Sequence, residues 1–192
     1  MTRDEVADAV LEAARSAFHN YGYAHTTMKG VASAAGVAPG VLRKYYASKE
    51  QMFAAAVRFP FDPSSAVPQL LAPGLEGMGE RLVRGTFEMV SDEQSRQELI
   101  DLFQSGIAAG KASADLREFL EESVIDRVAG VVGIPDARMR AALISSHLIG
   151  LATVRFIIRL EPLASAPEDD VVRMFAPIIQ DLLDPTKSIP GT

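Results

Sequence analysis

Apolar residues recur three and four positions apart along most of this chain, which is the spacing that places side chains on one face of an α-helix. Alternating runs of β-branched residues between turn residues, which would indicate strands, are not evident. The pattern therefore predicts an all-α protein. In the first predicted helix the apolar stripe comprises Val6, Val10, Ala13, Ala14, Ala17, Phe18 and Tyr21.

The first 59 residues predict four helices separated by turn residues. Thr2 and Glu5 have the T-x-x-E spacing of a capping box, in which each side chain bonds the backbone N–H of the other. Gly22 supplies the left-handed residue that ends the first helix. Ser48 is expected to cap the fourth. The predicted bounds are about 3–21, 26–36, 39–46 and 48–59.

The segment 60–74, PFDPSSAVPQLLAPG, contains four prolines and separates two parts of the chain, with at most a short helix near 67–71. Beyond it, Ser91 and Gln94 have the spacing of another capping box. Helices are predicted there at about 75–91, 93–109, 112–132, 136–160 and 167–184. The predicted domains are a helix-turn-helix head at 1–59, a connector at 60–74, a helical ligand-binding and dimerisation domain at 75–185, and a flexible tail at 186–192.

Two short helices joined by a glycine-containing turn, within residues 22–53, match the arrangement of a helix-turn-helix. In such a unit the first helix packs across the second, so that the exposed face of the second can enter the major groove of DNA. Leu42 would pack inward and leave Arg43 and Lys44 on or near the outer face. Lys49 at the start of the fourth helix suits a phosphate, because free N–H groups and a positive charge meet there.

The stretch TTMKGVASAAGVAPGVLRKYYASKEQMF makes this interpretation specific. Its TT pair, VA, AGV, PG, paired aromatics and SKE, in this order and spacing, resemble the DNA-binding region of the tetracycline-repressor (TetR) family of bacterial transcriptional regulators. The resemblance covers the head well and the remainder more loosely. It implies an all-helical fold with a three-helix unit that binds operator DNA. It also implies a C-terminal domain that dimerises and binds an effector, in a homodimeric repressor that a small molecule releases.

The resemblance also implies roles for single residues. The threonines that start the second helix, together with Tyr45 and Lys49, would contact phosphates, whereas Tyr46 is expected in the core. Two positions depart from the family, because Ala38 replaces a frequent Ser or Thr and Arg43 a frequent Tyr. Arginine can pair with O6 and N7 of guanine, worth roughly 1–3 kcal/mol of discrimination, which suggests a G-containing half-site. The predicted DNA-binding residues are Thr26, Thr27, Lys29, Ala38, Pro39, Gly40, Arg43, Lys44, Tyr45 and Lys49.

Charge is distributed unevenly along the 192 residues. The 19 basic and 25 acidic residues give a net charge of −6, which by itself would argue against nucleic acid as a partner. Residues 1–50, however, contain six basic and five acidic residues, so that the remainder has a net charge of −7. Between Lys29 and Lys49 there are four basic residues and no acidic one. This asymmetry favours a DNA-binding head on an acidic body.

Polar residues, among them His147 and Arg155, interrupt an apolar helix in the second part of the chain. Two interpretations stay open: satisfied polar groups in a core or at a dimer seam, or the lining of an effector pocket. An unpaired buried charge is very costly, so Arg155 requires an acidic side chain or an anionic ligand as its partner. The candidate pocket residues are Phe87, Phe103, Phe119, His147, Arg155 and Phe156.

The last two predicted helices have long apolar faces. The resemblance implies that they pair with their copies in a four-helix bundle around a two-fold axis. Such a dimer would place two recognition helices near one DNA turn apart, roughly 34–36 Å or somewhat more. The candidate dimer residues are Leu143, Leu148, Leu151, Val154, Ile158, Val171, Met174, Phe175, Ile178, Ile179 and Leu182.

Composition argues against several other kinds of chemistry. With no cysteine and three scattered histidines, neither a metal site nor a cofactor is expected. The chain has no nucleophile elbow and no phosphate loop, so no enzyme is predicted. The N-terminus has no apolar core and does not resemble a signal peptide. The apolar run 141–160 contains Arg155 and Arg159, which predicts a buried helix instead of a membrane span, in a cytoplasmic protein.

Two other classes of function compete with the regulator. One is a helical cavity protein with enzymatic activity, and the other is an adaptor that binds protein through residues 22–58. Salt-sensitive binding to the DNA upstream of the chain's own coding region would separate the regulator from both.

Overall fold

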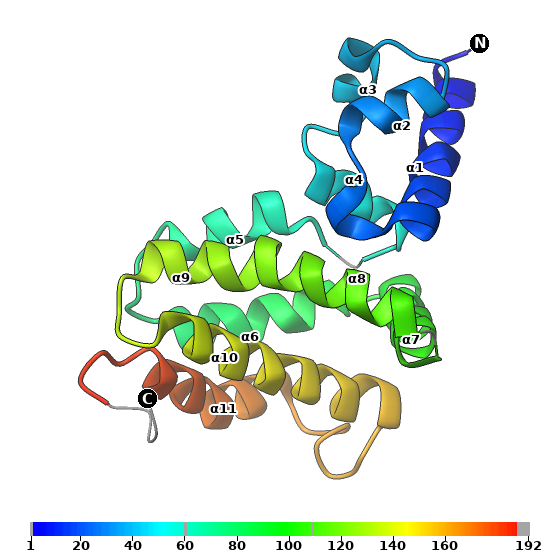
Figure 1. Cartoon of the computed structure of the whole chain (residues 1–192). Helices are drawn as coiled ribbons and strands as arrows, with labels where there is room; N and C mark the ends of the chain where they lie inside the picture. The colour runs from blue at the N-terminus through cyan, green and yellow to red at the C-terminus, as the bar shows by residue number, and fades with distance from the viewer. Residues whose placement is uncertain (1, 60, 109, 188–192) are drawn as a thin grey trace. The chain divides into compact units, whose positions relative to one another are not determined.

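Helices are the only regular elements among the residues that the computed structural model of this chain describes, namely 2–59, 61–108 and 110–187 (Figure 1). For residues 102–108 and 110–113 the backbone alone is described. The prediction of an all-α protein is confirmed.

Four helices form the start of the chain, close to their predicted bounds: α1 (Arg3–His25), α2 (Met28–Ala34), α3 (Pro39–Tyr45) and α4 (Lys49–Ala56). The predicted capping box is present at α1. The hydroxyl of Thr2 accepts the N–H of Glu5 at 3.2 Å, and the Glu5 carboxylate accepts the N–H of Thr2 at 2.8 Å. At α4 the hydroxyl of Ser48 accepts the N–H of Gln51 at 3.1 Å, as expected of a cap. Gln51 reaches back to the N–H of Ala47, at 2.7 Å.

Two later segments, η1 and η2, are π-helical and continue their neighbours without a break, which no sequence pattern indicates. The stretch predicted as a connector contains α5, which is longer than the short helix expected there. The bounds are α5 (Pro63–Leu71), α6 (Met78–Met89), α7 (Glu93–Ala108), α8 (Gly110–Leu120), η1 (Glu121–Ile125), α9 (Asp126–Val132), α10 (Ala137–Ala152), η2 (Thr153–Ile158) and α11 (Glu168–Leu182).

Contacts divide the chain into two compact units. The first unit comprises the residues up to Ser64 together with Glu98–Ser123, and the second comprises Ser65–Gln97 and the residues from Val124 on. Helix α8 therefore packs with the head, against α1, although it lies in the predicted C-terminal domain. Sequence order does not show such a contact.

An aromatic cluster forms the core of the first unit. The rings of Tyr23 and Phe53 lie 4.9 Å apart, and the ring of Phe119 from α8 lies 4.8 Å from Phe53. Two further rings belong to the cluster. The ring of Phe18 lies 4.9 Å from that of Phe53, and the ring of Phe59 lies 5.2 Å from that of Phe119. Burial of several aromatic rings contributes strongly to stability. The cluster therefore holds α1, α4 and α8 together.

Helix α1 breaks at Gly22, whose φ of 82° and ψ of 172° are not helical, and then continues for one more turn. The N–H groups released by this break donate to carboxylates of α8. The N–H of Tyr23 lies 2.9 Å from Oδ1 of Asp115, and the N–H of Ala24 lies 3.2 Å from Oε2 of Glu118. A Cβ at position 22 would lie 2.8 Å from Oδ1 of Asp115, so the position requires glycine both for its φ and for space.

In the second unit α6 and α11 approach each other closely at Gly79. A Cβ there would lie 2.3 Å from the carbonyl oxygen of Ala176 and 2.8 Å from the backbone nitrogen of Gln180. The Gln180 amide accepts the N–H of Gly79 and donates to the carbonyl of Leu75, each at 2.9 Å. The buried residues of this core are Met78, Val83, Phe87, Ile144, Leu151, Val171, Val172, Ile179 and Leu183.

Arg140 of α10 is only 2% exposed, and it binds the end of α11. Its Nη1 donates to the carbonyls of Leu182 at 2.8 Å and of Asp184 at 3.1 Å, and its Nη2 donates to that of Lys187. Its Nε donates to the carbonyl of Pro135 at 2.8 Å. The charge is thus held at the negative end of a helix, where carbonyls lack helical partners.

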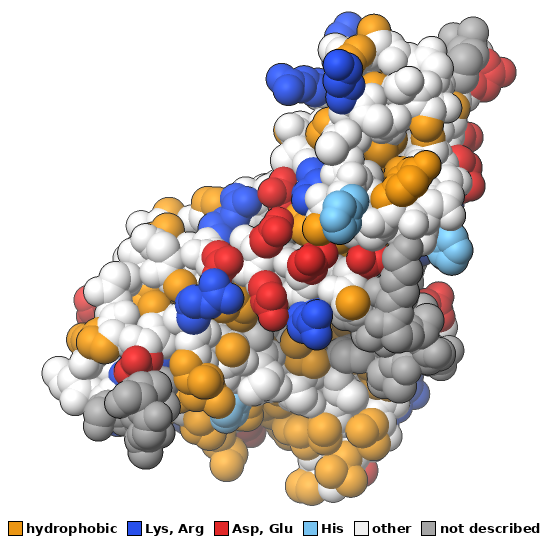
Figure 2. Space-filling model, in the orientation of Figure 1, with side chains coloured by type: hydrophobic (Ala, Val, Ile, Leu, Met, Phe, Trp, Pro, Cys, Tyr) orange, Lys and Arg blue, Asp and Glu red, His pale blue; other side chains and the backbone are white. Residues whose placement is uncertain are grey.

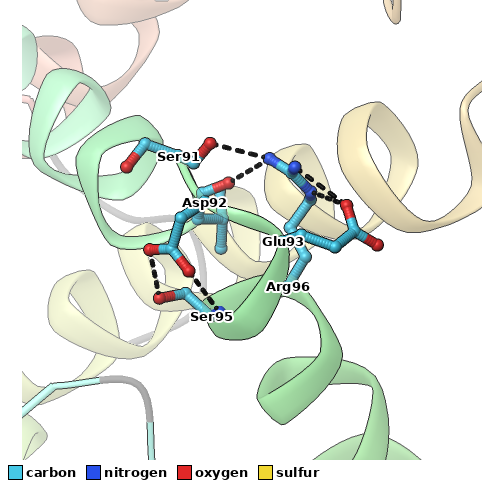
Figure 3. Close-up of polar contacts among 6 residues, drawn as sticks. Ser91, Asp92, Glu93, Ser95 and Arg96 are labelled. Carbon is cyan, nitrogen blue, oxygen red and sulfur yellow. Dashed lines mark hydrogen bonds and ion pairs between the residues drawn. The ribbon is translucent and has the colours of Figure 1, made fainter.

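Helix α7 is capped by Asp92, one residue after the predicted cap Ser91 (Figure 3). The prediction of a Ser91–Gln94 capping box is therefore wrong. Asp92 accepts the N–H of Ser95 at 2.8 Å and its hydroxyl at 2.7 Å, and these bonds lower the pKa of the Asp92 carboxyl. Arg96 donates to the carbonyl of Ser91 at 2.9 Å and pairs with Glu93 at the same distance, which closes the turn before the helix (Figure 3).

One helical segment among the described residues, Ala137–Ile158, is long and apolar enough to cross a membrane by length and composition. The core helix of a soluble protein passes the same test. The sequence predicts a buried helix here, but only 22% of an apolar 18-residue stretch of this segment is buried within the chain. Ile144 and Leu151 pack into the core, whereas Ile149 and Ile158 are exposed. The predicted burial therefore holds for one face of this helix only.

Candidate nucleic-acid interface

Helices α2 and α3 form the predicted helix-turn-helix. The hydroxyl of Thr27 caps α2 by accepting the N–H of Gly30 at 3.1 Å. Gly36, with φ of 67°, lies in the turn between the helices, and α3 follows from Pro39. Leu42 is fully buried in the core of the first unit. The inner side of α3 is thus fixed and its outer side is left to solvent.

The outer face of α2 and α3 is basic. Lys29, Arg43 and Lys44 are exposed, and none of them pairs with a carboxylate among the described residues. Figure 2 shows Lys and Arg side chains gathered at the end of the unit formed by these helices. We call the face made by exposed Thr27, Lys29, Ala38, Pro39, Gly40, Arg43 and Lys44 the basic face.

The two threonines at the start of α2 differ in accessibility. Thr26 is 3% exposed, and its hydroxyl donates to the carbonyl of Gly22 at 2.7 Å. Thr27 is exposed, and its hydroxyl hydrogen is free to turn outward because the oxygen acts as the acceptor in the cap. Of the two predicted phosphate contacts, Thr27 therefore fits the surface role, and Thr26 fits a role inside the first unit.

Lys49 is partly buried and is held against α1. Its Nζ lies 3.9 Å from the centre of the Tyr23 ring and donates to the carbonyl of Tyr23 at 3.2 Å. An ammonium group has three donors, so two of them stay available to an anion. The lysine thus joins α4 to the break in α1 and keeps a positive charge near the surface.

The two consecutive tyrosines have different environments. Tyr46 is half-buried against the core of the first unit, as predicted, and burial raises the pKa of its hydroxyl. Tyr45 is also partly exposed, but its hydroxyl donates to the carbonyl of Arg3 at 3.1 Å. The sequence did not indicate that the first turn of α1 adjoins α3, because Arg3 and Tyr45 are 42 positions apart.

Three of the six predicted pocket residues lie together in the second unit. The rings of Phe87 and Phe156 are 5.6 Å apart, and the Arg155 guanidinium lies 5.2 and 5.4 Å from them. Arg155 donates to the carbonyl of Ala166 at 2.8 Å and to that of Leu163. Its partners are thus main-chain carbonyls, which neither sequence-based alternative named. Its Nε has no hydrogen-bond partner among the described residues.

Two of the other three candidates, Phe119 and His147, lie elsewhere. Phe119 belongs to the aromatic cluster of the first unit, and the side chain of Phe103 is outside the described residues. His147 lies on α10, where its Nδ1 is 2.7 Å from the carbonyl of Leu143. The prediction that all six line one pocket is therefore not supported. His147 instead lines an open groove of about 400 Å³ with Ser146, Gly150, Leu151, Val154, Leu163 and Phe175.

The predicted dimer residues divide by burial. Leu151, Val171 and Ile179 are 5%, 6% and 0% exposed and belong to the core of the second unit. Ile158, Met174 and Ile178 are exposed, as are two apolar residues that the sequence analysis did not select, Ile149 and Leu160. Those with intermediate exposure are Leu143, Leu148, Val154, Phe175 and Leu182.

Comparison with known proteins gives consistent results. The family model of bacterial regulatory proteins of the tetR family matches residues 10–56, and that of the tetracyclin repressor-like C-terminal domain matches residues 76–183. Among solved structures, a TetR-family regulator from Streptomyces coelicolor A3 is 30% identical, covers 94% of this chain and 96% of its own, and has a TM-score of 0.49. No curated protein matches the chain.

Two further solved structures are more distant. NalD of Pseudomonas aeruginosa, the secondary repressor of the MexAB-OprM multidrug efflux pump, is 18% identical, covers 92% of this chain and 94% of its own, and has a TM-score of 0.51. A transcriptional regulator from Rhodococcus sp. Rha1 is 22% identical, covers 96% and 99%, and has a TM-score of 0.45.

The match of the C-terminal model alone spans more than half of the chain, and the Streptomyces relative reaches its identity over nearly the whole length of both proteins. The N-terminal match includes the helix-turn-helix and the whole of α4. Members of this family are generally DNA-binding repressors that bind ligands. The chain therefore belongs to the TetR family of bacterial transcriptional regulators.

Proposed function

We propose that this chain is a homodimeric transcriptional repressor that binds operator DNA through the basic face and leaves it when a small-molecule effector binds the second unit. The observation that supports this most is the exposure of Lys29, Arg43 and Lys44 without carboxylate partners among the described residues. Cations on one face of a helix-turn-helix match the phosphates of a duplex, and they release counterions on binding.

The residues of the basic face differ in what they can recognise. Lys29 and Lys44 are point charges that suit phosphates, with Thr27 as a further hydroxyl donor. Arg43 has the planar fork that pairs with O6 and N7 of guanine. At the start of α3, Ala38 makes no side-chain capping bond. A Cβ at position 40 would have no neighbour within 4 Å among the described residues. These small residues allow the helix to approach the base edges closely.

Lys49 is proposed as a phosphate contact that is held in place by the first unit. The Tyr23 ring and carbonyl fix its ammonium group. A lysine held in this way loses less side-chain entropy on binding than a free one. Its contribution should be independent of base sequence, unlike that of Arg43.

The apolar surface of α10, η2 and α11 is proposed as the dimer interface. Ile149 and Ile158 on one helix, and Met174 and Ile178 on the other, are exposed in the single chain. Contiguous exposed apolar patches mark interaction sites, and two-fold pairing of the same patch is the commonest way to cover one. Family membership supports a second copy of this chain as the occupant. Leu151, Val171 and Ile179 do not belong to this proposed interface, since they are already buried in the protomer.

The effector site is proposed around the group that the structure brings together, Phe87, Arg155 and Phe156. Two aromatic faces beside a guanidinium suit a flat or anionic molecule. An anion would compete with the carbonyls of Leu163 and Ala166 for Arg155, and these carbonyls belong to the loop before α11. An effector shifts the protein between two states only as far as its affinities for them differ.

Selection of the bound sequence from random DNA, together with a binding assay on the region upstream of the coding sequence, tests the proposal. We expect one palindromic operator, and an affinity that falls steeply as salt rises because several phosphates are neutralised. Absence of binding to both pools at low salt would contradict the proposal. Binding to all sequences alike would contradict the role of Arg43 while leaving that of the lysines.

A further inference from the structure

We propose that Tyr45 does not bind a DNA phosphate itself but positions the first turn of α1, so that Arg3 becomes an additional phosphate contact beside the recognition helix. This inference rests on the proposed function, since it concerns the same DNA. The observation behind it is the hydrogen bond from the Tyr45 hydroxyl to the main-chain carbonyl of Arg3, at 3.1 Å.

A phenol has a single O–H donor, and phosphate oxygens accept hydrogen bonds but do not donate them. Because the O–H of Tyr45 already donates to Arg3, binding a phosphate directly would require that bond to break. A helical carbonyl can accept a second donor, so the bond does not disturb the first turn of α1. The present arrangement therefore favours positioning by Tyr45 over direct contact.

The bond places the backbone of Arg3 beside the end of α3. Tyr45 is in the last turn of α3, the same short helix that presents Arg43 and Lys44. Its hydroxyl forms a tertiary hydrogen bond that joins the end of this helix to the start of α1. Arg3 is exposed, and its guanidinium has no ion pair among the described residues. Its charge is thus available next to the basic face.

The first turn also contains acidic residues, which limit what can approach DNA there. Glu5 is engaged in the capping box with Thr2, and Asp4 is exposed. Their charges stabilise the positive end of α1. They would repel phosphates, so we assign the contact to Arg3 alone, whose long side chain can extend away from the turn.

The test is a double-mutant cycle on the full-length protein, with binding to the selected operator measured at several salt concentrations. Arg3→Ala removes the charge but keeps the main-chain carbonyl, so the bond from Tyr45 stays possible. We expect a several-fold loss of affinity. The slope of log K against log salt should decrease by about 0.9 for each head, since each loses one phosphate contact, and so by about 1.8 for a dimer on its operator. Arg3→Lys should restore the slope. Tyr45→Phe should weaken binding in the same way but less.

The decisive comparison is Tyr45→Phe in the Arg3→Ala background, where the inference predicts no further change in affinity or slope. An equal loss in both backgrounds would show that Tyr45 binds DNA directly and would overturn the inference. An unchanged salt slope in Arg3→Ala would also overturn the inference. The same holds for a Tyr45→Phe variant that unfolds at a lower denaturant concentration but keeps its salt slope. Tyr21→Phe, at a tyrosine that is 66% exposed on α1, is the matched control and should change nothing. If the unmodified protein bound no DNA, the proposed function itself would fail, which is a distinct result.

Discussion

Two faces of this chain are exposed without a partner among the residues that the structure describes, and their chemistry is opposite. The basic face presents Arg43 and Lys44 beside small residues, whereas α10 and α11 present apolar side chains, of which Met174 is 78% exposed. A cationic face gains free energy by releasing counterions from DNA, so salt weakens it. An apolar face gains by losing contact with water, so its pairing depends on protein concentration and little on salt. The two faces should therefore respond to different conditions.

In the proposed dimer, DNA binding by the basic face also depends on pairing through the apolar face. A dimer presents two basic faces to one operator, so the second head binds at a high effective concentration after the first. The affinity for a palindromic operator then depends on the apolar face as well as on the basic one. Substitutions in either face should weaken DNA binding. Only substitutions in the basic face should change the slope of log K against log salt for each head.

The largest effect is expected from Met174→Glu, which places a charge in the apolar face. Burying an unpaired carboxylate is very costly, so the dimer should dissociate. Light scattering should give a mass near 20.6 kDa, instead of twice that value for the unmodified protein. Affinity for the full operator should fall by at least about a hundredfold, since one head then binds alone.

The matched control for this variant is Val131→Glu, at a residue that is 64% exposed on α9 and outside the proposed interface. It should keep the mass of the dimer. A mass near 20.6 kDa for the unmodified protein at micromolar concentration would contradict the dimer. Dissociation by both variants alike would indicate that added charge acts nonspecifically.

Burial on the last helix shows where sequence-based prediction of this apolar face succeeds and where it stops. Helical periodicity correctly indicated that Val171, Met174 and Ile178 are apolar positions of one amphipathic helix. It could not distinguish Val171, which packs on the chain's own core, from Met174, which is exposed. All are apolar, and only the neighbouring helices decide which part of a broad apolar face is already covered.

The head was more predictable because its signals are local. The capping box of Thr2 with Glu5 and the cap of Ser48 depend on residues three positions apart, and the structure contains both bonds. The contact of Tyr23 with Asp115 joins residues 92 positions apart, and no local pattern indicates it. The long-range polar contacts that fix the head were therefore missed, although the elements themselves were found.

A second prediction concerns the support of the apolar face within the second unit. Gly79→Ala adds a Cβ that would lie 2.3 Å from the carbonyl of Ala176, so α6 and α11 must move apart. Overpacking of this kind typically costs about 1–3 kcal/mol of unfolding free energy. Denaturant titration should show the loss, and the dissociation constant of the dimer should rise. The slope of log K against log salt should stay the same for each head, because Gly79 lies in the second unit and no phosphate contact is lost.

Gly85→Ala on the same helix is the control, because its Cβ would have an ordinary contact of 3.7 Å with Leu70. It should leave stability unchanged or raise it by up to about 1 kcal/mol, since alanine favours the helix over glycine. If Gly79→Ala were equally harmless, the close approach of α6 to α11 would not limit the packing of the second unit.

On the basic face, Arg43→Ala should relax the preference at one base pair of each half-site. Loss of the bidentate contact to guanine is expected to cost about 1–3 kcal/mol on the preferred sequence and little on sequences with another base there. Selection of bound DNA by the variant measures this directly. Lys44→Ala is the comparison, and it should weaken all sequences alike. Equal losses across all base variants for Arg43→Ala would contradict base recognition by this residue.

The smallest expected effect is that of Lys29→Ala, which removes one exposed charge from α2. The slope of log K against log salt should decrease by about 0.9 for each head that loses a phosphate contact. The oligomeric mass should not change, because this charge lies in the first unit, outside the apolar face. Arg173→Ala, at an exposed side chain that pairs with Asp170 on α11, is the control and should leave the slope as it is. A slope that changed with Arg173 but not with Lys29 would place DNA on the second unit, and would reverse the assignment of the two faces.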